Sequence, residues 1–204
     1  MRIVTVKPDS FGANTYLLIS GKEAYVVDPS VSVSAIVRAA LQEGAEISGI
    51  LLTHGHFDHI ISLDTLRDAT EADAYIHESD AEMLLDGRKN AFYTFFGRDR
   101  AYRPAERLLT DRSVIRIGDE EIRIIHTPGH TRGSLCYLCG DLLVTGDTLF
   151  AQSYGRCDLW GGDIQLMRSS LERLSHLPKT TIIYPGHGES ARLCDALDSV
   201  AYLI

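Results

Sequence analysis

The sequence lacks several features that define common classes of protein. It has no hydrophobic run that approaches the roughly 20 residues of a membrane-spanning helix. Residues 1–8 alternate in polarity and contain no apolar signal segment. Cysteine is scarce, with four in 204 residues, which excludes a disulfide-rich scaffold. Without an export signal, these cysteines predict reduced thiols and a cytoplasmic location.

Basic residues are also fewer than acidic residues. Lysine and arginine number 20 against 28 acidic residues, and the formal net charge is -8. Such a surface repels polyanions, so we expect neither nucleic acid nor an anionic membrane as a partner. The composition is 45% hydrophobic and 24% charged, which is ordinary for a globular protein with a sizeable core. The length favours a single domain, residues 1–204.

Short β-branched runs alternate along the chain with amphipathic segments. The first kind predicts strands, at residues 3–6, 15–19, 24–28, 49–53, 74–77, 114–117, 121–126, 134–138, 141–145 and 181–184. The second kind predicts helices at 34–43, 163–176 and 190–204, with shorter helices beginning at Asp58 and Ser79. Strands, helix, strand and helix recur in each half. This order predicts an α/β fold of two packed sheets with helices outside.

Residues 86–104 follow neither periodicity. They are rich in aromatic residues, including Phe92 and Tyr93, and in arginine and lysine. A long irregular insertion in a compact domain is often functional. We expect it to form a lid or a substrate wall for a small anionic molecule, because aromatic rings flanked by cations suit a carboxylate-bearing ligand. The alternative is that it only packs over the sheets.

A dense cluster of metal-ligand side chains follows the predicted strand at 49–53. It comprises His54, His56, Asp58 and His59. His54 and His56 are two residues apart, so an extended backbone points both rings the same way. Three imidazoles and a carboxylate suit borderline-soft divalent metals. Four adjacent ligands cannot all reach one tetrahedral ion without strain, which suggests that two ions share them.

Three further strand ends carry a possible ligand. Pro-Gly turns present His130 and His187 after predicted strands, and Asp147 follows another strand through a glycine. Each of these residues alone is about as easily explained by a capped turn. Together with the first cluster they predict one metal centre at the meeting point of four strand ends.

Other residues of the same types receive structural interpretations. His77, His126 and His176 match no ligand position, and we expect core or surface roles for them. Cys136 and Cys139 have CxxC spacing but lie in a predicted strand, where alternation sends the two sulfurs to opposite faces. Cys157, beside Arg156 in a predicted site loop, is a candidate for a reactive thiol.

The ligand order, His-x-His-x-Asp-His followed by His130, Asp147 and His187, resembles the metallo-β-lactamase fold. Within that superfamily the chain is similar to short glyoxalase II-like hydrolases without a C-terminal helical domain. The likeness covers about residues 12–190 and includes the strings Thr-Pro-Gly-His-Thr at 127–131, Gly-Asp-Thr-Leu-Phe at 146–150, Gly-Arg-x-Asp at 155–158 and Pro-Gly-His-Gly at 185–188. It implies a four-layer αββα sandwich with two mixed sheets.

The resemblance also implies roles for the ligands. His54, His56 and His130 would bind the first ion, Asp58, His59 and His187 the second, and Asp147 would bridge them. The ions would be divalent, with zinc preferred over iron or manganese. A hydroxide between them would attack a carbonyl, and two such cations lower the pKa of a shared water. Asp58 would orient this water, and Asp28 would hydrogen-bond a ligand histidine.

Thioester hydrolysis of glyoxalase II type, on an S-acyl-glutathione or a related thiol, is the activity that the resemblance favours. The chain departs from the long-form enzymes at two places. It has Arg156 and Asp158 where they present a lysine and then a tyrosine, and Glu189 where they present a tyrosine. Arg156 keeps a positive charge for an acidic thioester.

Three alternatives stay open. Persulfide dioxygenases share the fold and a Gly-Arg-x-Asp string but use one iron held by two histidines and a carboxylate. Other branches of the fold hydrolyse lactones, phosphodiesters or β-lactams. A structural or storage metal protein is the non-enzymatic alternative, although structural sites are usually closed and rich in sulfur.

Overall fold

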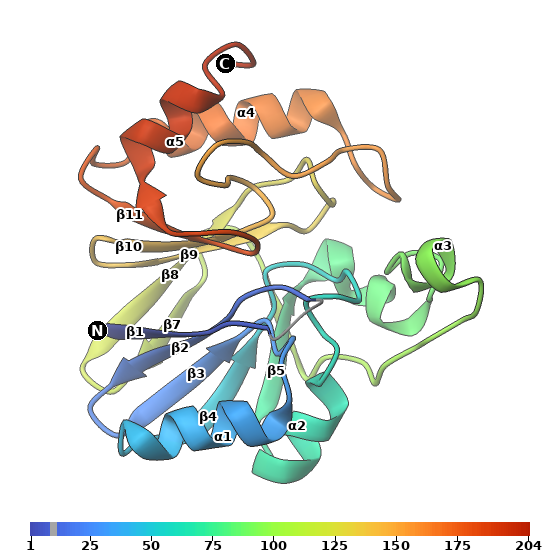
Figure 1. Cartoon of the computed structure of the whole chain (residues 1–204), viewed down its shortest axis with the longest axis vertical. Helices are drawn as coiled ribbons and strands as arrows, with labels where there is room; N and C mark the ends of the chain where they lie inside the picture. Colours follow the sequence, from blue (N-terminus) through green and yellow to red (C-terminus); the bar gives the residue numbers. More distant parts are fainter. Residues whose placement is uncertain (9–11) are drawn as a thin grey trace.

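The computed structural model describes residues 1–8 and 12–204, and its strands form two six-stranded sheets (Figure 1). The first sheet has the order β1-β2-β3-β4-β5-β6. β1 to β3 are antiparallel and β3 to β6 are parallel. Their bounds are β1 (Arg2–Val6), β2 (Thr15–Ser20), β3 (Glu23–Val27), β4 (Glu46–Leu51), β5 (Asp73–His77) and β6 (Arg107–Leu109).

The second sheet has the order β12-β11-β10-β9-β8-β7 and is also mixed. Its neighbouring strands are antiparallel except β10 and β11, which run parallel. The bounds are β7 (Val114–Ile117), β8 (Glu120–His126), β9 (Leu135–Cys139), β10 (Leu142–Gly146), β11 (Ile182–Pro185) and β12 (Ala191–Arg192).

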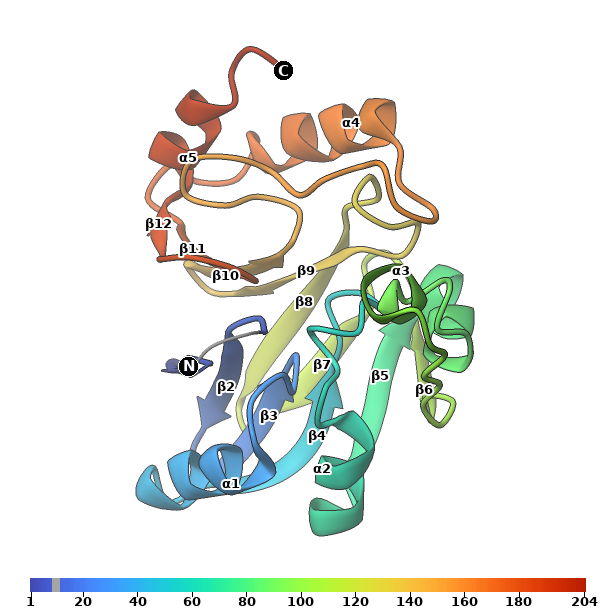
Figure 2. The same cartoon turned by 45° about the vertical axis from the view of Figure 1, so that its right-hand side comes forward.

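Helices cover the outer face of each sheet (Figure 2). α1 (Val33–Gln42) and α2 (Leu63–Thr70) lie on the first sheet, and α4 (Ile164–Leu174) and α5 (Leu193–Ser199) lie on the second. Three buried clusters correspond to the three interfaces between these layers. The middle cluster joins residues such as Leu18 and Leu51 of the first sheet to Ile124 and Tyr137 of the second. The predicted four-layer αββα sandwich is therefore confirmed.

Alternation along the strands explains why each strand serves two interfaces. In β2, Leu17 and Ile19 pack toward the helices, whereas Tyr16 and Leu18 pack toward the other sheet. Cys136 and Cys139 in β9 follow the same rule, because the first packs under α4 and α5 and the second packs between the sheets. The predicted separation of the two sulfurs is confirmed, and no CxxC metal site forms.

The structure differs from the predicted elements in the short segments. The helix expected from Asp58 begins only at Leu63, because the backbone of residues 56–63 forms successive i→i+3 turns. The helix expected from Ser79 is the 3₁₀ helix η1 (Glu78–Leu85). The last predicted helix starts with the two-residue strand β12 before α5. Periodicity alone does not separate such short elements.

Residues 86–104 project beside the open ends of the sheets and contain one short helix, α3 (Phe92–Phe96) (Figure 2). The rest of the segment has no helix or strand. Within the described part of the chain, no helix has the length and apolar character needed to span a bilayer.

Candidate metal centre

Loops from both sheets meet at one end of the sandwich and bring together all seven predicted ligands. The loop after β4 carries four of them, His54, His56, Asp58 and His59. The loops after β8, β10 and β11 of the other sheet carry His130, Asp147 and His187. Donor atoms within this set lie within 4.8 Å of one another in three overlapping groups. These are His54 with His56 and His130, His54 with His59 and Asp147, and Asp58 with His59 and His187.

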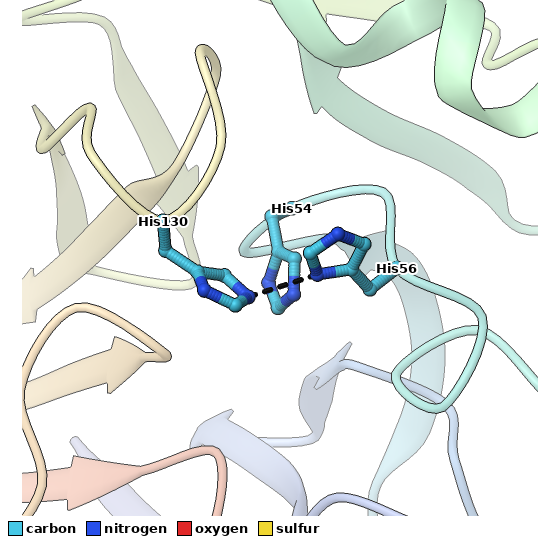
Figure 3. Close-up of side chains that lie close together, drawn as sticks. All are labelled: His54, His56 and His130. Carbon is cyan, nitrogen blue, oxygen red and sulfur yellow. Dashed lines mark hydrogen bonds between the residues drawn. The ribbon is translucent and has the colours of Figure 1, made fainter. Parts of the chain in front are cut away.

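The first group consists of three imidazoles that point toward one another (Figure 3). Nδ1 of His56 lies 2.8 Å from Nε2 of His130. The ring centroid of His54 is 4.8 Å from that of His56 and 4.7 Å from that of His130. All three side chains are buried, with at most 3% of each residue exposed.

Hydrogen bonds at the opposite ring nitrogens determine the tautomers of two histidines. Nδ1 of His130 lies 2.7 Å from the carbonyl oxygen of Arg156, which can only accept, so this nitrogen carries the proton. The Thr53 hydroxyl donates to Oδ2 of Asp28 at 2.6 Å, so Nδ1 of His54 must donate to the hydroxyl oxygen at 3.0 Å. In the neutral rings, Nε2 of both histidines therefore presents a lone pair to the centre.

The group of Asp58, His59 and His187 contains one carboxylate and is more open. Oδ2 of Asp58 lies 3.3 Å from Nε2 of His187 and 4.0 Å from Nε2 of His59. Asp147 lies between the two groups. Its Oδ1 is 3.3 Å from Nε2 of His59, and its Oδ2 is 3.6 Å from Nε2 of both His130 and His187. This position agrees with a bridging ligand.

Unpaired buried atoms test whether these residues suit metal ions. Nε2 of His54, Nε2 of His59 and Oδ1 of Asp147 are buried and have no hydrogen-bond partner among the described residues. A buried polar atom without a partner costs free energy. Lone pairs of nitrogen and oxygen that converge in this way are the donor set of divalent metals such as zinc. The residues therefore fit two metal ions.

Asp28 orients ligands of both groups. It follows β3 with a positive φ of 51°, and its Oδ2 lies 2.7 Å from Nδ1 of His59. The same carboxylate accepts from the backbone and hydroxyl of Thr53, and through that hydroxyl it holds His54. The expected contact between Asp28 and a ligand histidine is present, and it extends to a second ligand.

Burial and neighbouring charges shift the pKa values of the ligands in opposite directions. Burial, with help from His130, lowers the pKa of His56 to about 3, and burial holds the pKa of His54 well below its usual range. Burial also disfavours a charged His59, but the carboxylates of Asp147, Asp28 and Asp58 outweigh it and raise its pKa. Burial alone would raise the pKa of Asp147, yet nearby His59 holds it below its usual value. The carboxylates concentrate negative charge beside the neutral imidazoles of His54 and His56, and this favours cations.

Asp80 is a buried residue that the sequence did not single out. Its Oδ1 accepts from the backbone of Gly133 at 2.7 Å, and its Oδ2 accepts from the hydroxyl of Thr131 at 2.7 Å and from the backbone of Gly55 at 3.3 Å. Gly55 lies between two ligand histidines, and Thr131 follows His130. A Cβ at Gly133 would come within 2.8 Å of the Asp80 backbone. Asp80 thus connects the ligand loops of the two sheets.

A cavity of about 390 Å³ opens above the ligands. Its floor includes five of the seven, and its walls are largely apolar. The lining residues are His56, Phe57, Asp58, Ala91, Phe95, His130, Asp147, Phe150, Gly155, Arg156, Leu159 and His187.

The three residues predicted to contact substrate have different positions. Arg156 lines the cavity and forms two hydrogen bonds, at 2.6 and 2.7 Å, to the carboxylate of Asp158. Phe92 is buried behind Phe57, with ring centroids 5.4 Å apart. The Tyr93 ring packs under the guanidinium of Arg88, 4.1 Å away. Phe95, from the same helix, lines the cavity instead.

The histidines and the cysteine outside the ligand set have their own contacts. The rings of His77 and His126 stack with centroids 4.0 Å apart, and His176 contacts the carbonyl oxygen of Glu172 in the last turn of α4. Burial raises the pKa of Cys157 to about 11, which leaves little reactive thiolate at neutral pH.

Comparison with known proteins supports the same assignment. A model of the metallo-beta-lactamase superfamily matches residues 8–187. The protein named probable metallo-hydrolase YqgX, from Bacillus subtilis, is 33% identical over 194 residues, which are 94% of this chain and 92% of that protein. The solved structure of the B3 metallo-beta-lactamase BLEG-1 is 34% identical, covers 99% of both chains and has a TM-score of 0.91.

A second solved structure bears on the metal ions. The protein TTHA1623, in a di-iron-bound form, is 29% identical and covers 96% of both chains with a TM-score of 0.82. The family match, the full-length similarity and the convergent ligands agree with one another. This chain belongs to the metallo-β-lactamase superfamily.

Proposed function

We propose that this protein is a binuclear metal-dependent hydrolase and that its substrates are small-molecule thioesters. The observation that carries the proposal is the convergence of seven ligand side chains on the floor of an accessible cavity. The carboxylate of Asp147 lies between the two groups, so the arrangement is suited to two ions and not to one. A closed structural site would have no such cavity above it.

The ions would supply the central chemistry. When bound by these residues, two divalent cations lower the pKa of water and polarise a carbonyl group. Zinc is our first choice because imidazole and carboxylate donors suit it. The di-iron form of the similar TTHA1623 supports iron as a second choice.

The chain itself controls orientation and charge. Asp58 lines the cavity, and although burial alone would raise its pKa, nearby His59 and the hydrogen bond from His187 lower it. It is therefore ionised at neutral pH and can accept a hydrogen bond from the attacking water. Hydrogen bonds to Asp28, Thr53 and the Arg156 carbonyl hold the imidazoles of His59, His54 and His130 with their lone pairs inward.

The choice of a thioester is supported by the motifs around the ligands. The string Gly-Asp-Thr-Leu-Phe, which contains Asp147 and Phe150, and the Gly-Arg-x-Asp string, which contains Arg156, resemble those of glyoxalase II-like hydrolases. Phe150 and Arg156 both line the cavity, so these strings contribute to the substrate wall as well as to the metal centre.

β-Lactam hydrolysis is the second candidate. It is favoured by the similarity to the B3 metallo-beta-lactamase BLEG-1, which extends over nearly the full length of both chains. Both candidate reactions proceed by attack on a carbonyl carbon, and both would use the same metal centre.

The test combines metal content with a substrate panel. We expect about two equivalents of zinc, iron or manganese per chain, and hydrolysis of thioesters in preference to β-lactams, lactones and phosphodiesters. The assay uses protein loaded with each metal, and Asp147→Ala serves as the inactive control. A single iron, with oxygen consumption on a persulfide, would refute the hydrolase. Preferential β-lactam turnover would replace the thioester with the second candidate.

A further inference from the structure

The cavity above the metal ligands is divided into two chemical regions. Its floor is polar because it holds the ligands. Its walls are formed mainly by apolar side chains, namely Phe57, Ala91, Phe95, Phe150 and Leu159. A molecule whose reacting carbonyl lies at the floor must place a neighbouring group against these walls. The walls therefore bear on which substrate the centre accepts.

The aromatic part of this wall is built before any ligand binds. Phe57 is 4% exposed, and its ring contacts those of Phe92, Phe95 and Phe96 at centroid distances of 5.4 to 5.5 Å. The side chain of Phe95 lines the cavity, and the residue is 53% exposed. Leaving a phenyl face in water is unfavourable, and an apolar ligand group would cover it.

The arginine that lines the cavity is already paired with a carboxylate. Arg156 is the arginine of the lining, and it forms a two-point interaction with Asp158. Asp158 occupies Nε and Nη2 of Arg156, and its negative charge offsets the attraction of this arginine for a substrate carboxylate.

The insertion places no cation in the lining of the cavity, and the guanidinium of Arg98 lies over the Phe92 ring, 5.7 Å from its centroid. Arg88 packs on Tyr93, Lys89 forms an ion pair with Glu82, and Arg103 forms ion pairs with Asp64 and Asp68. Arg100 donates to the carbonyl oxygen of Ile61. These contacts weaken the expectation of an anionic substrate.

We propose that the substrate carries an apolar group, aliphatic or aromatic, directly beside the thioester, and that this group lies against Phe57, Phe95 and Leu159. The proposal rests on the thioester hydrolysis proposed above. The cavity volume of about 390 Å³ lies near the lower end of the roughly 300–1,000 Å³ range of small-molecule pockets. It suits a short chain or one ring.

Two substrate series test the proposal with the metal-loaded protein. In the first, one small thiol carries acetyl, butyryl, hexanoyl or phenylacetyl groups. In the second, acetyl is attached to thiols of increasing alkyl length or to benzyl thiol. In one of the two series we expect kcat/KM to rise about fourfold for each added methylene. The series in which kcat/KM rises identifies whether the acyl group or the thiol group of the substrate contacts the wall.

Charge is tested with a matched pair. Succinyl and butyryl thioesters have similar length and differ by a carboxylate. We expect the butyryl thioester to be hydrolysed faster. A preference for succinyl, or values of kcat/KM that are flat along both series, would overturn the proposal.

Variants locate the contact. Phe95→Ala should lower kcat/KM about tenfold for the longest apolar substrate and by a smaller factor for the smallest substrate. Tyr93→Ala is the control, because Tyr93 lies on the same helix, packs under the guanidinium of Arg88 and does not line the cavity. Equal effects of the two substitutions would show that the wall is not the binding surface.

A binding measurement separates this proposal from the thioester assignment. Calorimetry would measure the binding of butyrate, hexanoate and phenylacetate to the protein. We expect the affinity to rise with the size of the apolar group and the heat-capacity change of binding to be negative. Phe95→Ala should remove this trend. If no thioester is hydrolysed but the trend is present, the proposed function fails and the apolar site stands. If affinity does not depend on apolar size, the apolar site is refuted whatever the reaction.

Discussion

The two groups of metal ligands differ in burial and in charge. His54, His56 and His130 are neutral imidazoles, at most 3% exposed. In the other group, the side chains of Asp58 and His187 are 21% and 40% exposed, and one of them is a carboxylate. An ion held by the first group would be the less exposed of the two, because its ligands are more deeply buried. An ion held by the second would be within reach of solvent and substrate.

This difference suggests a division of work between the two ions. The ion in the buried group would be bound tightly and would exchange slowly, because its release needs the surrounding loops to open. The exposed group would exchange faster and meet the substrate first. Asp147 belongs to both and should matter most.

The largest effect is expected for Asp147→Ala. This change removes the carboxylate between the groups, so both ions should be lost and kcat/KM should fall by about a thousandfold or more, equivalent to about 4 kcal/mol. Metal content by elemental measurement and turnover by assay test this together. A variant that retained both ions or near-normal turnover would contradict the bridging role.

The next effect separates the groups. His187→Ala should lose about one ion per chain and keep the other, whereas His130→Ala should weaken retention of the buried ion. Stepwise chelation with metal analysis would measure both, with His176→Ala as a control on the exposed end of α4. Identical loss of metal from the two variants would show that the groups do not differ.

A smaller effect is expected when ligand orientation is altered. Asp28→Asn disturbs His59 directly and His54 through Thr53, so the metal affinity of both groups should fall by about 10- to 100-fold. Thr53→Val removes the hydroxyl between Asp28 and His54 alone, so only the buried group should weaken. Competition with a chromogenic chelator gives the affinities. Equal losses from the two groups in Thr53→Val would contradict this assignment.

The smallest effect concerns a histidine outside the centre. Burial and the stacked ring of His126 lower the pKa of His77 from 6.5 to about 4. Below pH 6.5 the imidazole of His77 becomes protonated in the unfolded chain but stays neutral in the folded chain. Stability should therefore fall as pH drops from about 6.5 to about 4, by on the order of 1 kcal/mol.

His77→Asn tests this contribution. The variant keeps a short polar side chain that can accept the backbone hydrogen bond from Ser79. Urea unfolding of metal-free protein at several pH values should show a shallower decline for the variant than for the wild type. An unchanged decline would mean that other groups carry the pH dependence.

The convergence of the seven candidate ligands could be predicted because the sequence signals for it are local. His54 and His56 follow a β-branched run at the spacing of an extended chain, and His130 and His187 follow Pro-Gly turns. Such signals depend on a few neighbouring residues. The order of the elements predicted two packed sheets with helices outside, and the family resemblance added the four-layer αββα form. Neither predicted the strand order within each sheet, since alternation alone does not tell which strands pair.

The cavity wall could not be predicted in the same way. Phe92 and Tyr93 were expected to contact substrate, but Ala91 adopts a positive φ of 67° at the start of α3. This turn directs Phe92 toward Phe57 and leaves Phe95 at the cavity. Asp80 gave no signal because its partners lie 25 to 53 residues away in sequence.

The donation of ligands by both sheets has a consequence for how the protein is made. Four ligands come from the first sheet and three from the second, so neither half can assemble the centre alone. The complete centre therefore requires docking of the two sheets, and bound ions would act as a noncovalent crosslink between them. Cells short of the metal would accumulate chains that melt at a lower temperature. The supply of the ion would then set the abundance of the protein as well as its activity.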